Sequence, residues 1–212
     1  MAFNNNNTAP RNLDMNTFRS QLDAYGQVAK SARYVVRITP TGSTLRSKLA
    51  TDAQSLIYAC DAFEFPGRGF NVTEVRYYGP AQSFPNNVLY SPSNASFICR
   101  NDSIERQFFD DWMDIINPTS NFNFDYAENY WADIDVFHYH EIGQPPAGTP
   151  LVLSQAELDR RSTDPKPIYA WSLRKVWPTL VAPQQVTWAD QDILRLQVTF
   201  TYKYWDRPNV TR

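Results

Sequence analysis

Alternation of apolar and polar residues predicts several β-strands along this chain. Residues 33–39 and 131–140 alternate in this way, which is typical of strands with one buried face. Residues 192–205 give the longest alternating run. Shorter strands are expected at residues 56–65, 71–78, 95–100 and 168–176, several of them bounded by Gly and Pro turns.

Helical periodicity predicts one amphipathic helix at residues 103–116, with an apolar stripe formed by Ile104, Phe108, Trp112 and Ile115. Asp102 is its expected N-cap, with Glu105 three residues later, and Asn117-Pro118 ends it. A short helix, broken near Gly26, is expected within residues 16–32. Because the expected strands far outnumber the helices, the pattern predicts a mainly β fold, a sandwich or barrel with one packed helix.

The chain shows no internal repeat and no clear domain boundary, so we expect a single β domain over residues 16–206. Residues 1–15, which include four consecutive Asn, are expected to form a flexible N-terminal arm, and residues 207–212 a C-terminal tail. The stretch before the strand at 95–100 contains Pro85 and Pro92 and therefore cannot lie in the centre of a sheet. Residues 143–167 are predicted to be an inserted loop.

Composition then narrows the functional classes. The 212 residues are 42% hydrophobic and 15% aromatic, which excludes a disordered polar chain. The formal net charge of −2 provides no polybasic field to hold nucleic acid or an anionic membrane. No secretory signal and no apolar run near the roughly 20 residues of a membrane span is evident. With only 7 Gly, the chain also has no phosphate-binding or nucleophile-elbow motif.

Candidate chemistry is sparse. His138 and His140 point the same way on a strand, but two ligands fall short of the three or four that a metal usually takes. Cys60 and Cys99 lie 39 positions apart and have no companion pair, so we expect two reduced thiols in preference to a disulfide. The chain has paired carboxylates at positions 110 and 111 and at positions 133 and 135. Such pairs can perform acid–base catalysis, but the first pair is expected on a solvated helix face and neither is expected to be catalytic. We therefore expect no enzyme activity, no metal and no cofactor.

Residues 174–205 carry a more specific ordered pattern. Arg174-Lys175-Val176-Trp177-Pro178 ends one strand, a short return and an acidic turn follow, and the terminal strand ends in Tyr202-Lys203-Tyr204-Trp205. This order resembles the major tail tube proteins of contractile-tailed bacteriophages. Further pieces appear in the family's order: Phe18 with Gly26, Ala32 to Val36, Phe65-Pro66-Gly67, Phe108 to Met113 and Tyr130 to Tyr139. The resemblance covers residues 16–142 and 165–206, whereas residues 41–55 and 143–167 are longer than a compact member requires.

The resemblance implies a two-sheet β-sandwich with one flanking α-helix, which closes as a hexameric ring and stacks into the inner tube of a contractile tail. The tube would be assembled in the host cytoplasm and become part of the virion tail, where it conducts DNA. Its implied partners are copies of itself, the tail sheath protein, the baseplate or tube initiator, the tape measure protein and the tail terminator. Genomic DNA would pass through it without specific binding.

The resemblance also implies roles for particular residues. Residues 66–92 would be the stacking loop between rings, through Arg68, Phe70, Arg76, Tyr77 and Tyr78. Asp133 and Asp135 are expected on the lumen, since a wall around moving DNA should not be basic. The helix acids Asp110, Asp111 and Asp114 are expected to face the sheath. The expected core side chains are Phe108, Trp112, Trp177, Trp188 and Trp205.

Other functions stay open at this point. A baseplate tube initiator or the tube of a contractile injection system would share the fold. A monomeric carbohydrate-binding β-sandwich would use exposed Trp and Tyr as stacking platforms. A hydrolase using paired Asp is the remaining alternative.

Overall fold

The computed structural model describes residues 31–139, 167–188 and 192–208, except the side chain of Ile168. The predicted arm 1–15, nearly all of the predicted helix 16–32, His140 and most of the insertion 143–167 lie outside the described residues. Two units divide the chain, one formed by residues 1–33, 139–168 and 212, the other by residues 34–138 and 169–211. The sheets, surfaces and cavity below belong to the second unit.

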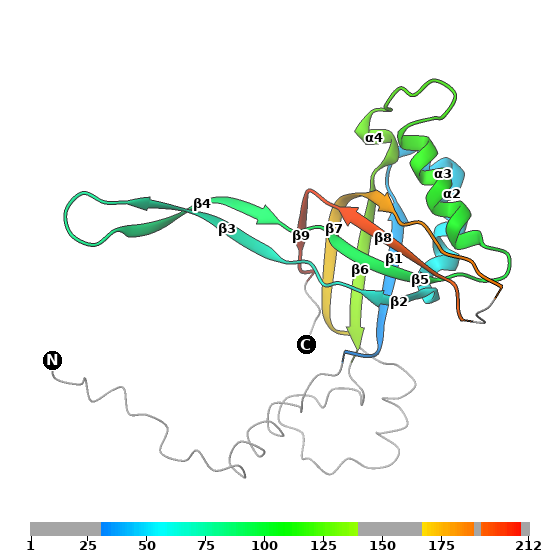
Figure 1. Cartoon of the computed structure of the whole chain (residues 1–212), viewed down its shortest axis with the longest axis horizontal. Coiled ribbons are helices and arrows are strands. Elements are labelled where there is room, and N and C mark those ends of the chain that lie inside the picture. Colours follow the sequence, from blue (N-terminus) through cyan, green and yellow to red (C-terminus); the bar gives the residue numbers. More distant parts are fainter. Residues whose placement is uncertain (1–30, 140–166, 189–191, 209–212) are drawn as a thin grey trace, which may run out of the picture. The chain divides into compact units, whose positions relative to one another are not determined.

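Strands dominate the described residues, as the sequence predicts (Figure 1). The strands are β1 (Tyr34–Pro40), β2 (Cys60–Phe63), β3 (Arg68–Val75), β4 (Gln82–Tyr90), β5 (Ser93–Ile98), β6 (Ala132–Tyr139), β7 (Pro167–Val181), β8 (Arg195–Thr201) and β9 (Tyr204–Asp206). The helices are α2 (Ser43–Ser55), α3 (Ile104–Ile116) and the short α4 (Ala127–Tyr130), with a 3-10 turn at Leu56–Tyr58.

Two sheets account for the described strands. The larger has the order β1-β6-β7-β8-β5-β2, with β9 also pairing with β7, and the smaller is the β3–β4 hairpin. Strand β7 belongs to both halves of the larger sheet: Ser172–Arg174 pairs with β9, and Trp177–Val181 pairs with β8. Between these two stretches Lys175 has a φ of 56°, so the strand bends there. The mainly β, two-sheet prediction is confirmed.

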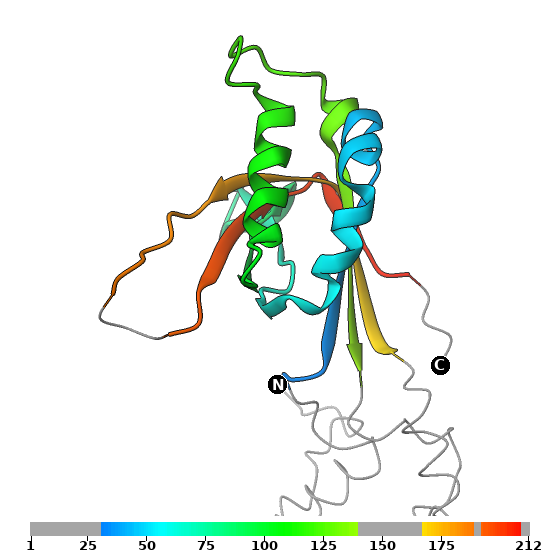
Figure 2. The same cartoon turned by 90° about the vertical axis from the view of Figure 1, so that its right-hand side faces the viewer.

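The hydrophobic core lies between the two halves of the larger sheet and the pair α2 and α3, which run side by side in Figure 2. The buried positions of β1 and β6 alternate, as the sequence pattern predicts. Helix α3 buries Phe108, Phe109 and Trp112, whose rings contact Phe200 or one another, and the Trp112 indole donates a 2.8 Å hydrogen bond to the Tyr130 carbonyl. Trp112 thus ties α3 to the end of α4, just before β6 begins.

Several predicted elements need correction. Helix α2 lies in residues 41–55, the stretch longer than a compact member requires, for which no helix was predicted. Its buried stripe consists of only Leu45, Leu49 and Ala53, so its pattern is weak. Pro85 lies in β4, where a strand was not expected, and is tolerated because β4 pairs only with β3. The terminal strand breaks at Tyr202 and Lys203 into β8 and β9.

Two predictions about single residues are also wrong. The N-cap of α3 is Ser103, with a φ of 52°, rather than Asp102. Trp188 is fully exposed rather than part of the core, since it lies in the β7–β8 connection, beyond the strands. Of the other predicted core residues, Phe108 and Trp112 are buried, and Trp177 and Trp205 are partly buried against the core.

Candidate assembly surfaces

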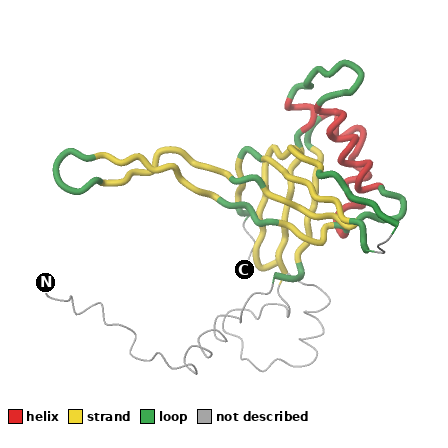
Figure 3. Tube along the Cα trace, in the orientation of Figure 1, coloured by secondary structure: helices red, strands yellow, loops and turns green. Residues whose placement is uncertain are grey.

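The β3–β4 hairpin is the most exposed apolar element among the described residues. It projects from the larger sheet as a two-stranded ribbon (Figure 3). Pairing runs from Arg68 with Tyr90 to Val75 with Gln82, and a register shift between Phe70 and Val72 interrupts it. Gly79, with a φ of 83°, supplies the left-handed backbone conformation in the turn at the tip. All five predicted stacking-loop residues therefore lie on this hairpin.

Apolar side chains on the hairpin face solvent. Phe70 is 53% exposed, Val72 60%, Tyr77 88% and Tyr78 98%, and Phe84, Val88 and Leu89 are exposed as well. The guanidinium of Arg68 lies 5.3 Å from the centre of the Phe70 ring. An isolated two-stranded hairpin is marginally stable in water, and an apolar surface of this kind marks a contact site.

The base of the hairpin is held by contacts with the larger sheet. The Tyr202 hydroxyl donates a 2.7 Å hydrogen bond to the Ser91 carbonyl, and the Trp205 indole donates one of 3.3 Å to the Gly67 carbonyl. The rings of Tyr90 and Tyr202 also meet edge to face, 6.0 Å apart. Both ends of the hairpin are thus held, one by Tyr202 between β8 and β9 and the other by Trp205 in β9.

Asp133 and Asp135 lie on the outer face of β6 and are both paired. Asp135 accepts hydrogen bonds from Arg37 at 2.7 Å and Ser172 at 2.6 Å. Asp133 accepts from the Arg174 guanidinium at 2.9 Å and from the Lys175 backbone at 3.1 Å. The sequence identified the acids and missed their cations. This face therefore has mixed charge and is not an acidic wall.

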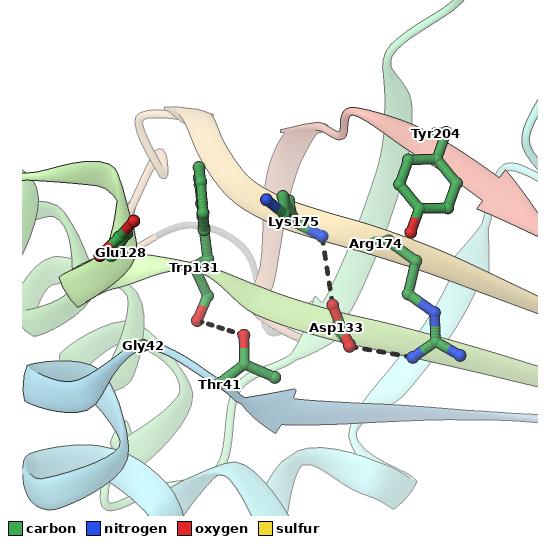
Figure 4. Close-up of a pocket in the computed structure, with 8 residues that line it drawn as sticks. All are labelled: Thr41, Gly42, Glu128, Trp131, Asp133, Arg174, Lys175 and Tyr204. Atoms are coloured by element: carbon green, nitrogen blue, oxygen red, sulfur yellow. Dashed lines mark hydrogen bonds and ion pairs between the residues drawn. The ribbon is translucent and has the colours of Figure 1, made fainter.

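A cavity of about 300 Å³ opens beside this network (Figure 4). It is lined by Thr41, Gly42, Glu128, Trp131, Asp133, Arg174, Lys175 and Tyr204. The Lys175 ammonium lies 4.2 Å from the centre of the Trp131 ring, a cation–π contact that the bend in β7 makes possible. We refer to this cavity as the Trp131 pocket.

One wall of the Trp131 pocket is held by close backbone contact. The backbone N–H groups of Thr41 and Gly42 both donate to the Trp131 carbonyl, at 3.0 and 2.7 Å. A Cβ on Gly42 would stand 2.3 Å from the Asn129 carbonyl oxygen. Only glycine lets the β1–α2 connection approach α4 this closely, so this wall of the pocket depends on Gly42.

The acids of α3 and the loop after it form a third surface. Asp110 pairs with Arg106 at 2.8 Å, and Asp114 accepts a hydrogen bond from the Thr119 backbone. Asp111 is exposed on the same helix. In the loop, Phe122, Phe124 and Tyr126 are all exposed.

Titratable groups elsewhere serve structure. Burial, and secondarily the charge of Asp61, raises the pKa of the Cys60 thiol to about 12, so this thiol is a poor nucleophile. Burial alone would raise the pKa of Glu105, but hydrogen bonds from the backbone and guanidinium of Arg100 outweigh it and hold that pKa below its usual value. In the described residues no group of three or more His, Cys, Asp or Glu is placed to hold a metal.

These features are those of a mainly β protein with an exposed apolar hairpin and a face of paired charges. The phage tail tube protein family matches residues 29–207, and the chain belongs to this family. The match confirms the resemblance inferred from the sequence. A protein of this family is a component of the phage tail. Among the described residues, no helix has the length and apolar character needed to cross a membrane.

Solved structures share the fold at low sequence identity. The chain is similar to a protein in the sheath–tube complex of an extracellular contractile injection system in its extended state, with a TM-score of 0.56, 13% identity, and coverage of 89% of this chain and 96% of that one. A protein of the anti-feeding prophage baseplate is similar to the chain with a TM-score of 0.55 and 13% identity. The match covers 88% of this chain and 99% of that one. A protein in the sheath and tube terminator of the first system has a TM-score of 0.54 and 12% identity to the chain. The match covers 85% of this chain and 96% of that one. None of the curated proteins matches the chain.

Proposed function

We propose that this chain is the repeating subunit of a phage tail tube, in which six copies close into a ring and rings stack into a conduit for DNA. The observation that carries the proposal is the exposed apolar hairpin on a member of the tail tube family. Heterologous contacts of this kind build rings and filaments, because the donor surface and the acceptor surface differ.

The hairpin is the contact between adjacent rings in this proposal. Phe70, Tyr77 and Tyr78 become buried against the next ring, which removes apolar surface from water. The fixed base of the hairpin supports this role, because a preorganised element loses less conformational freedom on docking.

The outer face of β6 lines the lumen in this proposal. Its carboxylates Asp133 and Asp135 are balanced by Arg174 and Arg37. A face of paired charges gives phosphate groups neither a basic patch to bind nor a strong repulsive field, which suits DNA in transit.

The acids of α3 face the tail sheath protein. Asp111 and Asp114 are exposed, and their carboxylates offer charge-assisted hydrogen bonds to basic groups of a sheath subunit. Reversal of both to Lys should weaken sheath attachment without blocking tube growth, and unchanged sheath binding would contradict this assignment. The baseplate, tape measure and terminator proteins are the further partners of such a tube, which assembles in the host cytoplasm.

Electron microscopy of the purified chain at increasing concentration tests the proposal. The wild type should form rings and hollow rods. A variant with Phe70, Tyr77 and Tyr78 all changed to Ser should form rings that do not stack. Wild-type rings that never stack would instead favour a baseplate tube initiator. A monomer at every concentration would overturn the proposal and favour a binding module.

A further inference from the structure

The hairpin tip needs an acceptor, and in a stack of identical subunits the acceptor lies on the same chain. Tyr77 and Tyr78 stand almost fully exposed at the tip, beside Arg76. The acceptor should offer a hollow with an aromatic wall and a carboxylate that can meet Arg76. Among the described residues, the Trp131 pocket combines these properties.

We propose that the hairpin tip of one copy docks in the Trp131 pocket of a copy in the next ring. A tip tyrosine ring packs against Trp131 and Tyr204, and Arg76 meets Glu128. This inference rests on the proposed function, since it names the acceptor for the same hairpin contact.

The size and chemistry of the pocket fit a tyrosine. The volume of about 300 Å³ is at the lower end for a site that takes a small organic group. Trp131 and the half-exposed Tyr204 ring provide apolar contact. The Lys175 ammonium and the Thr41 hydroxyl stand at the same cavity and can meet a phenol oxygen. A tyrosine has the matching form, an apolar ring with one polar end.

Charge complementarity supports the same pairing. The hairpin carries two Arg, at positions 68 and 76, against one Glu at position 74. The segment 106–128, which reaches the pocket at Glu128, carries exposed or partly exposed acids at positions 110, 111, 114, 125 and 128 against one Arg at position 106. The pocket itself is lined by two acids, Glu128 and Asp133, and two cations, Arg174 and Lys175. Because Asp133 is already paired with Arg174, the charge complementarity rests on Arg76 of the tip with Glu128 of the pocket.

The placement of the two surfaces suits a head-to-tail contact. The hairpin leaves the larger sheet on the side away from α2, α3 and α4 (Figure 1). The pocket runs from Glu128 in α4 to Tyr204 in β9, so it is a different surface from the hairpin tip. A donor and an acceptor that differ make a heterologous contact, which gives a closed ring or an open filament according to the rotation between copies.

Reciprocal charge reversal tests the pairing in the full-length chain. Arg76→Glu alone and Glu128→Arg alone should each raise the concentration needed for rods about tenfold, because like charges then meet at the contact. The double variant should restore assembly, since every contact in its rods again joins opposite charges. The matched control, Arg76→Glu with Asp52→Arg on α2, makes the same net charge change and should not restore it.

Cross-linking provides a second readout. Copies with Tyr77→Cys and differently tagged copies with Thr41→Cys should form a disulfide-linked pair in mixed rods, whereas Tyr77→Cys with Asp52→Cys should not. The wild type could form rods while the cysteine pair gives no cross-link and Glu128→Arg has no effect on assembly. That outcome would overturn the pocket as the acceptor and leave the tube proposal standing. A wild type that never assembles overturns both. Circular dichroism confirms that each variant is folded.

Discussion

Replacement of Gly42 by Ala should destabilise the fold strongly, for a purely steric reason. Gly42 has a φ of −62°, which any residue adopts. The added Cβ, however, would stand 2.3 Å from the Asn129 carbonyl oxygen, 2.5 Å from its carbon and 2.7 Å from the Tyr130 nitrogen. Real Cβ atoms keep at least 3.0 Å from such atoms, so the β1–α2 connection and α4 must separate by about 0.7 Å.

The magnitude follows from two contributions. Overpacking against backbone costs about 1–3 kcal/mol. The separation also stretches the hydrogen bonds from Thr41 and Gly42 to the Trp131 carbonyl, each contributing about 1 kcal/mol. We expect the free energy of unfolding to fall by about 3 kcal/mol, which is a large part of the 5–15 kcal/mol typical of a domain.

Urea unfolding of the unassembled chain, followed by Trp fluorescence, measures this change. Gly69→Ala is the matched control, because nothing lies within 4 Å of its added Cβ, and its unfolding free energy should change by less than about 0.5 kcal/mol. Equal effects of the two substitutions would refute the steric argument and the rigid wall of the Trp131 pocket.

Three further predictions concern stability and local opening. The pKa of Glu105 in the folded state lies below its unfolded value of about 4.3, so the ionised carboxylate stabilises the fold above that pH, and this stabilisation is lost as pH falls through the folded pKa. Urea unfolding measured from about pH 7 to 3 should show the unfolding free energy falling. In Glu105→Gln this pH dependence should be weaker. Tyr202→Phe removes the hydrogen bond to the Ser91 carbonyl, which contributes about 1 kcal/mol. Amide hydrogen exchange at the hairpin base should become faster by the factor that this energy corresponds to, and faster than any change in β6. Unchanged exchange at the hairpin base would contradict the anchoring role. Trp188→Ser should change the unfolding free energy by less than about 0.5 kcal/mol, whereas a large loss would mean that this indole is packed after all.

The parts of the fold that the sequence predicted are those where a single element carries its own signal. Strands β1 and β6 each bury one face, so their alternation is complete within a few residues. Helix α3 has a wide stripe of large apolar residues. Helix α2 presents only Leu45, Leu49 and Ala53 among Ser, Thr and Lys, and so its pattern is too narrow to separate it from a loop.

What the sequence could not predict depends on partners that are distant along the chain. Asp133 is paired with Arg174, 41 residues away, and Asp135 with Arg37, 98 residues away. Nothing local marks either cation as a partner. The exposure of Trp188 is of the same kind, because an aromatic residue near a strand is buried only if another element covers it.

The bend of β7 has a mechanical consequence. The chain crosses between the halves of the larger sheet twice, once at Lys175 within β7 and once at Tyr202 and Lys203 between β8 and β9. A single crossing would act as a hinge, whereas two neighbouring crossings resist rotation. The hairpin joins β2 and β5 in the chain, and the Trp131 pocket is lined from the β1–α2 connection, α4, β6, β7 and β9. Tyr202 and Trp205 hold the base of the hairpin, so a pull on the hairpin acts first on the second crossing, next to Tyr204 of the pocket.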